Sequence, residues 1–241
     1  MPLADAQNDL VIRYRVLMER LRTAERHRDR PQSSVNLVAV SKTYPAVDIR
    51  IIANEGQCDF GENQLQDAMG KIPALKDLGC TWHFIGPIQS NKCRDVAYHF
   101  DWVHSVDRLK IARRLSELRP KSASPLNILL QVNLQNEATK SGVRTSEVAN
   151  LANAVKNLPN ICLRGLMTIP LPEKDLERQR AVFAKLRKLK ETVNRDQEIN
   201  MDCLSMGMTD DLEAAIAEGA THVRIGTAIF GPRKQPPHRT T

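Results

Sequence analysis

The stretch that decides the fold class is Ile128-Leu129-Leu130-Gln131-Val132, which is almost continuously apolar. A strand of this composition fits a parallel sheet covered by helices, because both of its faces are then buried. Similar short runs recur along the chain, and stretches with helical spacing of apolar residues separate them, as in βα units. We count eight such runs, near residues 35–40, 58–60, 82–85, 102–105, 127–133, 161–167, 202–206 and 221–225.

Eight strand-helix units in 241 residues indicate a single (β/α)8 barrel, a fold of typically about 250 residues. The second run, Cys58-Asp59-Phe60, is short and carries a charge, so the pattern alone leaves an open, doubly wound sheet as an alternative. We assign residues 1–234 to the barrel. Residues 235–241 are basic and rich in proline, and we expect them to be a disordered tail.

An additional helix is expected before the first strand. Apolar residues there repeat at intervals of three and four, which is typical of an amphipathic helix, and the pattern ends before Pro31. The repeating positions are Leu10, Tyr14, Leu17, Met18 and Leu21.

Composition limits the classes of function. The chain has no apolar run of about 18 residues and no signal-peptide pattern, so we expect a cytoplasmic protein without membrane contact. Its five cysteines and six histidines lack the spacing of disulfide or metal sites, and we expect no metal. The net charge of +7 raises the question of nucleic acid, but the basic runs interleave with helically spaced apolar residues. They indicate solvated helix faces, and we expect no nucleic-acid partner.

Lys42 is the first candidate for chemistry. It follows the apolar run Val35–Val40 within the sequence Ser41-Lys42-Thr43. A lysine at the end of a strand is either a surface residue, which is the commoner case, or a reactive amine. An amine that has lost its proton can attack an aldehyde.

Two segments near the end of the chain suit a phosphate group. Leu204–Thr209 and Val223–Ala228 each combine a strand, a turn with glycine and the start of a helix. Such a turn directs backbone N–H groups and the positive end of a helix dipole at one point, although it can also cap a helix without any ligand. Together with Lys42, the two turns predict a site for pyridoxal 5′-phosphate (PLP). The candidate phosphate ligands are Ser205, Gly207, Gly226 and Thr227.

Several segments also carry a resemblance to a known family, namely Val38–Thr43, Phe60–Asn63, Trp82–Lys92, Lys140–Gly142, Arg164–Pro170, Leu204–Thr209 and Val223–Gly231. Over nearly its whole length the chain resembles the pyridoxal phosphate homeostasis proteins, and the segment Trp82–Lys92 is too specific for chance. The resemblance implies a barrel similar to that of alanine racemases, with PLP held as a Schiff base on Lys42. Tyr44 stands where many members carry a second lysine, so no role for that amine is carried over.

The remaining candidates surround the expected position of the cofactor ring. Arg224 precedes the turn at Gly226 and can reach the pyridine nitrogen, where a guanidinium opposes protonation; the alternative is an ordinary salt bridge. Asn63, His83 and Met167 are candidates for lining the ring, although the last two could equally be core residues. Lys140 either guides the cofactor or is simply exposed to solvent.

The predicted function is that of a PLP carrier with little or no turnover, which sequesters a reactive aldehyde and supplies it to PLP-dependent apoenzymes. The alternative is an amino-acid racemase. Racemisation of the alanine racemase kind needs two bases on opposite faces of the cofactor, the second from an additional domain, and this chain ends soon after its eighth run. A third class, a basic RNA-binding barrel, is disfavoured by the charge pattern. We expect a monomer and leave a weak dimer open.

Overall fold

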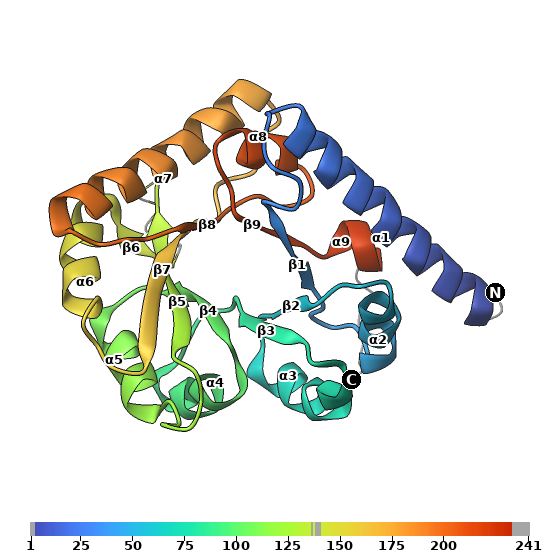
Figure 1. The fold of residues 1–241 in the computed structure, drawn as a ribbon, viewed down its shortest axis with the longest axis horizontal. Helices are drawn as coiled ribbons and strands as arrows, with labels where there is room; N and C mark the ends of the chain where they lie inside the picture. Colours follow the sequence, from blue (N-terminus) through green and yellow to red (C-terminus); the bar gives the residue numbers. More distant parts are fainter. Residues whose placement is uncertain (1–2, 136, 138–140, 233–241) are drawn as a thin grey trace, which may run out of the picture.

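The computed structural model describes residues 3–135, 137 and 141–232, and the statements below concern these residues. Eight parallel strands close into a barrel with helices on its outside (Figure 1). The order around the barrel is β1-β2-β3-β4-β5-β7-β8-β9, and β9 pairs with β1. This confirms the predicted (β/α)8 barrel. Lys140 and the expected tail, residues 235–241, lie outside the described residues.

The strands coincide with the predicted apolar runs to within a few residues. The short, charged second run does form a strand, and its Asp59 side chain contacts His83 on the next strand. A two-residue strand, β6, pairs with β5 outside the ring and was not predicted. The strands are β1 (Asn36–Val40), β2 (Asp59–Glu62), β3 (Thr81–Phe84), β4 (Trp102–Val106), β5 (Leu126–Asn133), β6 (Val143–Arg144), β7 (Ile161–Met167), β8 (Cys203–Ser205) and β9 (His222–Ile225).

Helices follow the strands around the ring (Figure 1). The α-helices are α1 (Leu3–Arg26), α2 (Ala46–Asn54), α3 (Leu65–Lys71), α4 (Cys93–His99), α5 (Leu109–Leu118), α6 (Val148–Val155), α7 (Leu176–Gln197), α8 (Leu212–Ala217) and α9 (Thr227–Phe230). Short 3-10 helices are η1 (Pro73–Leu78), η2 (Ser90–Lys92) and η3 (Thr145–Glu147). No described helix has the length and apolarity needed to cross a membrane.

The predicted N-terminal helix is confirmed as α1, which contacts α2, α8 and α9 on the outside of the barrel (Figure 1). Its buried face includes Leu10, Leu17 and Leu21. Arg20 on α1 pairs with Glu213 on α8 at 2.6 Å, so part of the basic character of this helix is neutralised within the fold.

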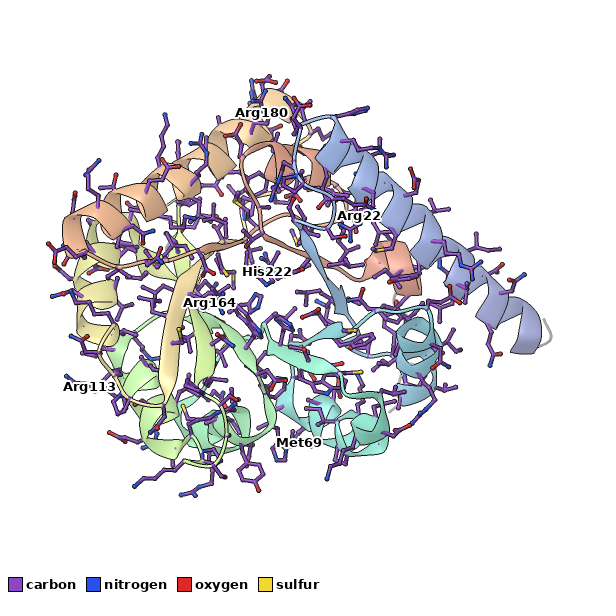
Figure 2. The ribbon with its side chains drawn as sticks, viewed as in Figure 1. Arg22, Met69, Arg113, Arg164, Arg180 and His222 are labelled. Atoms are coloured by element: carbon purple, nitrogen blue, oxygen red, sulfur yellow. The ribbon has the colours of Figure 1, made fainter. Side chains whose placement is uncertain are left out.

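Alternation along the strands separates two layers of buried side chains. On β1, Leu37 and Ala39 belong to the large apolar cluster. A Cβ atom added at Gly61 on β2 would lie 3.0 Å from Cγ1 of Val38. Successive residues of a strand point to opposite faces of a sheet, so Val38 faces the inside of the barrel. The interior also holds polar side chains, and Figure 2 shows His222 within the ring of strands.

Candidate functional site

A cavity of about 330 Å³ lies at the carboxyl ends of the barrel strands. This is the face at which (β/α)8 barrels place their chemistry, and the volume falls within the range of small-molecule sites, roughly 300–1,000 Å³. Its lining comes from the ends of six strands. The lining residues are Val40, Lys42, Tyr44, Asn63, Ile85, Gly86, Pro87, Ile169, Met208, Thr209, Arg224, Gly226 and Thr227.

Lys42 stands on a tight turn that is held from two sides. Thr43 has a left-handed backbone conformation with a φ of 69°, and the Tyr44 N–H donates to the Ser41 carbonyl at 3.1 Å. The Tyr44 hydroxyl donates to the carbonyl of Gly231 at 2.5 Å, and its ring stacks on Phe230 at 4.8 Å between centroids. These contacts hold the turn after β1 against α9, so the backbone of Lys42 has a fixed position at the edge of the cavity.

A buried polar cluster supports the same turn from behind. Glu62 Oε1 accepts hydrogen bonds from Ser41 Oγ at 2.6 Å and from Lys71 Nζ at 2.8 Å. Lys71 Nζ also donates to the Ser41 carbonyl at 2.9 Å. Glu62 is fully buried, its Oε2 atom has no hydrogen-bond partner among the described residues, and burial raises the pKa of its carboxyl. The cluster therefore fixes the residue before Lys42. No local sequence pattern predicts it.

Arg224 brings a buried cation to the cavity. Its Nη1 atom donates to Ser205 Oγ at 2.6 Å and its Nη2 atom donates to the Thr168 carbonyl at 2.9 Å. Burial lowers the pKa of the guanidinium to about 10, so Arg224 remains charged at neutral pH. Among the described residues its hydrogen-bond partners are a hydroxyl and a carbonyl, and Asp211 acts on it only as a nearby charge, so the alternative of an ordinary salt bridge is not seen.

The turn after β9 brings the backbone close to the first strand. A Cβ atom added at Gly226 would lie 2.9 Å from the Val40 carbonyl oxygen, which favours glycine at this position. Helix α9 begins at Thr227, and the first N–H groups of a helix have no partner within it. An amine, a guanidinium, threonine hydroxyls and a helix start thus converge on one cavity. This donor set fits a ligand with an aldehyde, an aromatic nitrogen and a phosphate group.

Of the nine predicted site residues, the cavity brings together Lys42, Asn63, Arg224, Gly226 and Thr227. The other four are not among its lining residues. His83, Met167 and Ser205 are buried inside the barrel, and Ser205 reaches the cavity only through its bond to Arg224. Gly207 has a φ of 96° and leads the chain to Met208 and Thr209, which do line the cavity.

The lining residues that sequence analysis missed are mostly apolar loop residues within the resembling segments: Ile85, Pro87, Ile169 and Met208. A second cavity of about 310 Å³ shares the first three of these and is also lined by Gln131 and Asn133. The four apolar residues could have been predicted to line the cavity from their positions shortly after the ends of strands.

Gly86 offers a test of how tightly the loops that line the cavity are packed. A Cβ atom added there would lie 2.0 Å from the backbone oxygen of Asn63, so Gly86→Ala must displace the loop after β2. We expect it to lower the free energy of unfolding by about 1–3 kcal/mol. The matched control is Gly70→Ala on the exposed face of α3, where nothing lies within 4 Å, and which should raise stability by about 0.5–1 kcal/mol. Urea denaturation measures both, and a neutral Gly86→Ala would show that the loop gives way easily.

Comparison with known sequences places the chain in a family. The profile of the family described as "Alanine racemase, N-terminal domain" matches residues 12–234. The pyridoxal phosphate homeostasis protein of Pseudomonas aeruginosa is 57% identical over 214 residues, which are 89% of this chain and 91% of that protein. The protein of the same name from Escherichia coli is 46% identical over 229 residues, covering 94% of this chain and 97% of that protein.

Comparison with solved structures indicates the same family and fold. PipY of Synechococcus elongatus, solved with PLP bound, is 37% identical with a TM-score of 0.78, covering 86% of this chain and 99% of PipY. The alanine racemase of Corynebacterium glutamicum is 16% identical with a TM-score of 0.71, covering 94% of this chain and 62% of the racemase, and shares the fold. The chain therefore belongs to the family of pyridoxal phosphate homeostasis proteins, built on the barrel of the alanine racemase N-terminal domain.

Proposed function

We propose that this protein binds PLP in the cavity at the carboxyl ends of the strands, holds it as a Schiff base on Lys42 and supplies it to PLP-dependent apoenzymes in the cytoplasm. Its own turnover is little or none. The observation that carries the proposal is the convergence of Lys42, Arg224 and the start of α9 on one cavity of about 330 Å³. The names of the relatives and the PLP bound to PipY support the same ligand.

Each part of the cavity has a role in this proposal. When bound, PLP supplies an aldehyde for a primary amine and a ring that can take up electrons. Lys42 supplies the amine, and Gly226, Thr227 and the turn from Gly207 to Thr209 hold the phosphate through N–H and hydroxyl groups. Asn63 lines the cavity and would contact the ring, while His83, Met167 and Ser205 would support the site from inside the barrel.

Arg224 explains the low turnover. A guanidinium only donates hydrogen bonds, so at the pyridine nitrogen it opposes protonation of that nitrogen. A ring that stays unprotonated withdraws fewer electrons from a bound amino acid, and carbanion chemistry is discouraged. Burial leaves Arg224 with a pKa of about 10, so it keeps its proton at neutral pH and remains a donor.

Amino-acid racemisation is the second candidate, because Tyr44 lines the cavity together with Lys42 and could act as an opposite base. Two contacts weigh against this role. The Tyr44 hydroxyl already donates its proton to the Gly231 carbonyl, and its ring is stacked on Phe230. Reorienting the hydroxyl toward a substrate would break both contacts, so we expect no efficient second base.

The two functions are separated by measuring reactivation of a PLP-dependent apoenzyme alongside Cα deuterium exchange of alanine in heavy water. We expect reactivation, with exchange far below the usual enzyme range of about 1–10³ s⁻¹, because a positioned acid or base contributes roughly 10²–10⁴-fold. Protein reduced with borohydride is the control, since its fixed cofactor cannot be transferred. Rapid exchange without reactivation would favour the racemase and reject the carrier.

A further inference from the structure

A continuous line of hydrogen bonds crosses the interior of the barrel. Asp59 Oδ1 lies 2.8 Å from His83 Nε2, and His83 Nδ1 lies 2.9 Å from His104 Nε2. His104 Nδ1 lies 2.8 Å from Ser205 Oγ, which accepts from Arg224 at 2.6 Å. In the proposed PLP carrier role only Arg224 contacts the ligand directly. The role of the other four residues is therefore still to be explained.

The line connects the two ends of the barrel. Its members come from β2, β3, β4, β8 and β9 in turn. His83, His104 and Ser205 are fully buried, while 30% of the Asp59 side chain is exposed. Asp59 is the first residue of β2, so it lies at the amino-terminal end of the barrel, whereas Arg224 lines the cavity at the other end.

The two ends of the line determine the direction of every bond. An ionised carboxylate only accepts, so His83 Nε2 carries a hydrogen and, in a neutral ring, its Nδ1 accepts. His104 must then donate from Nε2 and accept at Nδ1, so the Ser205 hydroxyl donates to it. That leaves the lone pairs of Ser205 for Arg224, which can only donate. All four bonds are satisfied in one direction when both histidines are neutral.

The surroundings favour a neutral ring at His104. Burial lowers the pKa of His104 well below its ordinary value, and it lowers the pKa of the neighbouring His222 to about 4. The positive charge of Arg164 also lowers the pKa of His222. This guanidinium lies 5.0 Å from the centre of the Trp102 ring and is paired with Asp202 at 2.6 Å. The barrel interior thus disfavours a further positive charge beside Arg224.

We propose that Asp59, His83, His104 and Ser205 are positioning residues that orient the Arg224 guanidinium toward the cavity. Ser205 holds Nη1 and the Thr168 carbonyl holds Nη2, and two anchors fix the plane of a guanidinium. The charge of Asp59 sets the direction of the line, which keeps the Ser205 oxygen available as an acceptor. The consequence for the ligand rests on the proposed function, in which Arg224 faces the PLP ring.

The direction of the line is tested on the ligand-free protein by long-range ¹⁵N–¹H NMR of its histidines. We expect His83 and His104 to carry their hydrogen on Nε2. Asp59→Asn replaces an obligatory acceptor with an amide that also donates, and it should shift the His104 signals, although Asp59 and His104 are not in contact. Asp101→Asn is the matched control, because Asp101 accepts from the Trp82 N–H outside the line, and it should leave His104 unchanged. A hydrogen on His104 Nδ1, or a His104 unaffected by Asp59→Asn, overturns the proposal.

The effect on the site is tested by removing the last link. Ser205→Ala should weaken PLP binding by roughly ten- to a hundredfold, as expected for one hydrogen bond to a charged group, and should change the visible absorption spectrum. Ser205→Thr keeps the hydroxyl and should restore most of both. Equal binding and spectra in the wild type and Ser205→Ala would reject the positioning role. Failure of the wild type to bind PLP would reject the proposed function instead, and the tautomers measured without ligand would still decide the direction of the line.

Discussion

Lys42→Ala should abolish the PLP adduct that borohydride traps, and in the wild type the adduct should lie on Lys42. Among the described residues, Lys42 is the one lysine that lines the cavity, and trapping requires a primary amine at the aldehyde. Loss of the amine should reduce the trapped fraction by more than about 100-fold, comparable to removing a positioned catalytic group. Peptide mass spectrometry locates the adduct, and the absorbance of the reduced protein quantifies it.

Two further variants separate the amine from the charge and from folding. Lys42→Arg keeps a cation but has no amine that can form the link, so it should fail as Lys42→Ala does. Lys110→Ala, on the exposed face of α5, should trap as much PLP as the wild type. Reversible binding to Lys42→Ala should persist, because this variant leaves unchanged the turn at Gly226 that we propose as a phosphate site. An adduct found mainly on Lys92 or Lys140 would contradict the assignment.

The positions of the strands could be predicted because each run is short, apolar and bounded by polar turns. Closure into a barrel could not, since the same periodicity suits an open sheet, and the resemblance to a family decided between them. The strand at Asp59 looked weak because of its charge, and the hydrogen-bond partner of this carboxylate, His83, comes next to it only in three dimensions. Strand β6 has two residues, too few to produce any periodic signal.

The candidate site was predictable to the extent that strand order determines it. Lys42, Asn63 and Gly226 each lie just beyond a strand end, where the chain turns into the cavity. His83 and Ser205 lie within strands and point inward, so they fill the barrel below the cavity instead of lining it. The distance of a residue from a strand end in the sequence therefore does not predict how deep in the barrel its side chain lies.

The cluster of Ser41, Glu62 and Lys71 could not be predicted for a different reason. Glu62 and Lys71 lie on a strand and on the helix that follows it, and Ser41 belongs to the preceding strand-helix unit. No local pattern joins them. A buried carboxylate in a strand becomes plausible only when the tertiary structure supplies a cation and a hydroxyl within hydrogen-bond distance.

Lys71→Met should lower the free energy of unfolding by about 3–5 kcal/mol, the effect typical of removing one partner from a buried ion pair. Methionine has a similar volume, but it leaves the Glu62 carboxylate buried without its cation. The matched control is Lys76→Met, which changes an exposed lysine of η1 and should be nearly neutral. Urea denaturation at neutral pH measures both variants.

The loss should depend on pH, because Lys71 is the main group that opposes the upward shift of the Glu62 pKa. In the folded wild type, burial already raises this pKa, and removal of Lys71 raises it further. A carboxyl whose pKa is raised by folding binds its proton more tightly in the folded state. The protonated form therefore stabilises the fold at low pH, and this contribution is lost as the pH rises through the folded pKa. The deficit of Lys71→Met should be full at neutral pH and shrink as the pH falls through the raised pKa of Glu62.

The double variant Lys71→Met/Glu62→Gln isolates the charge from the shape of the cluster. The amide introduced by Glu62→Gln can still accept a hydrogen bond from Ser41 Oγ but carries no charge. Most of the stability lost in Lys71→Met should therefore return. The pH dependence of the deficit should also disappear, because no titrating carboxyl remains in the cluster. A double variant as unstable as Lys71→Met would mean that packing around the lysine chain, and not the isolated carboxylate, causes the loss. Recovery without pH dependence would instead show that the buried carboxylate behind Lys42 is what Lys71 neutralises.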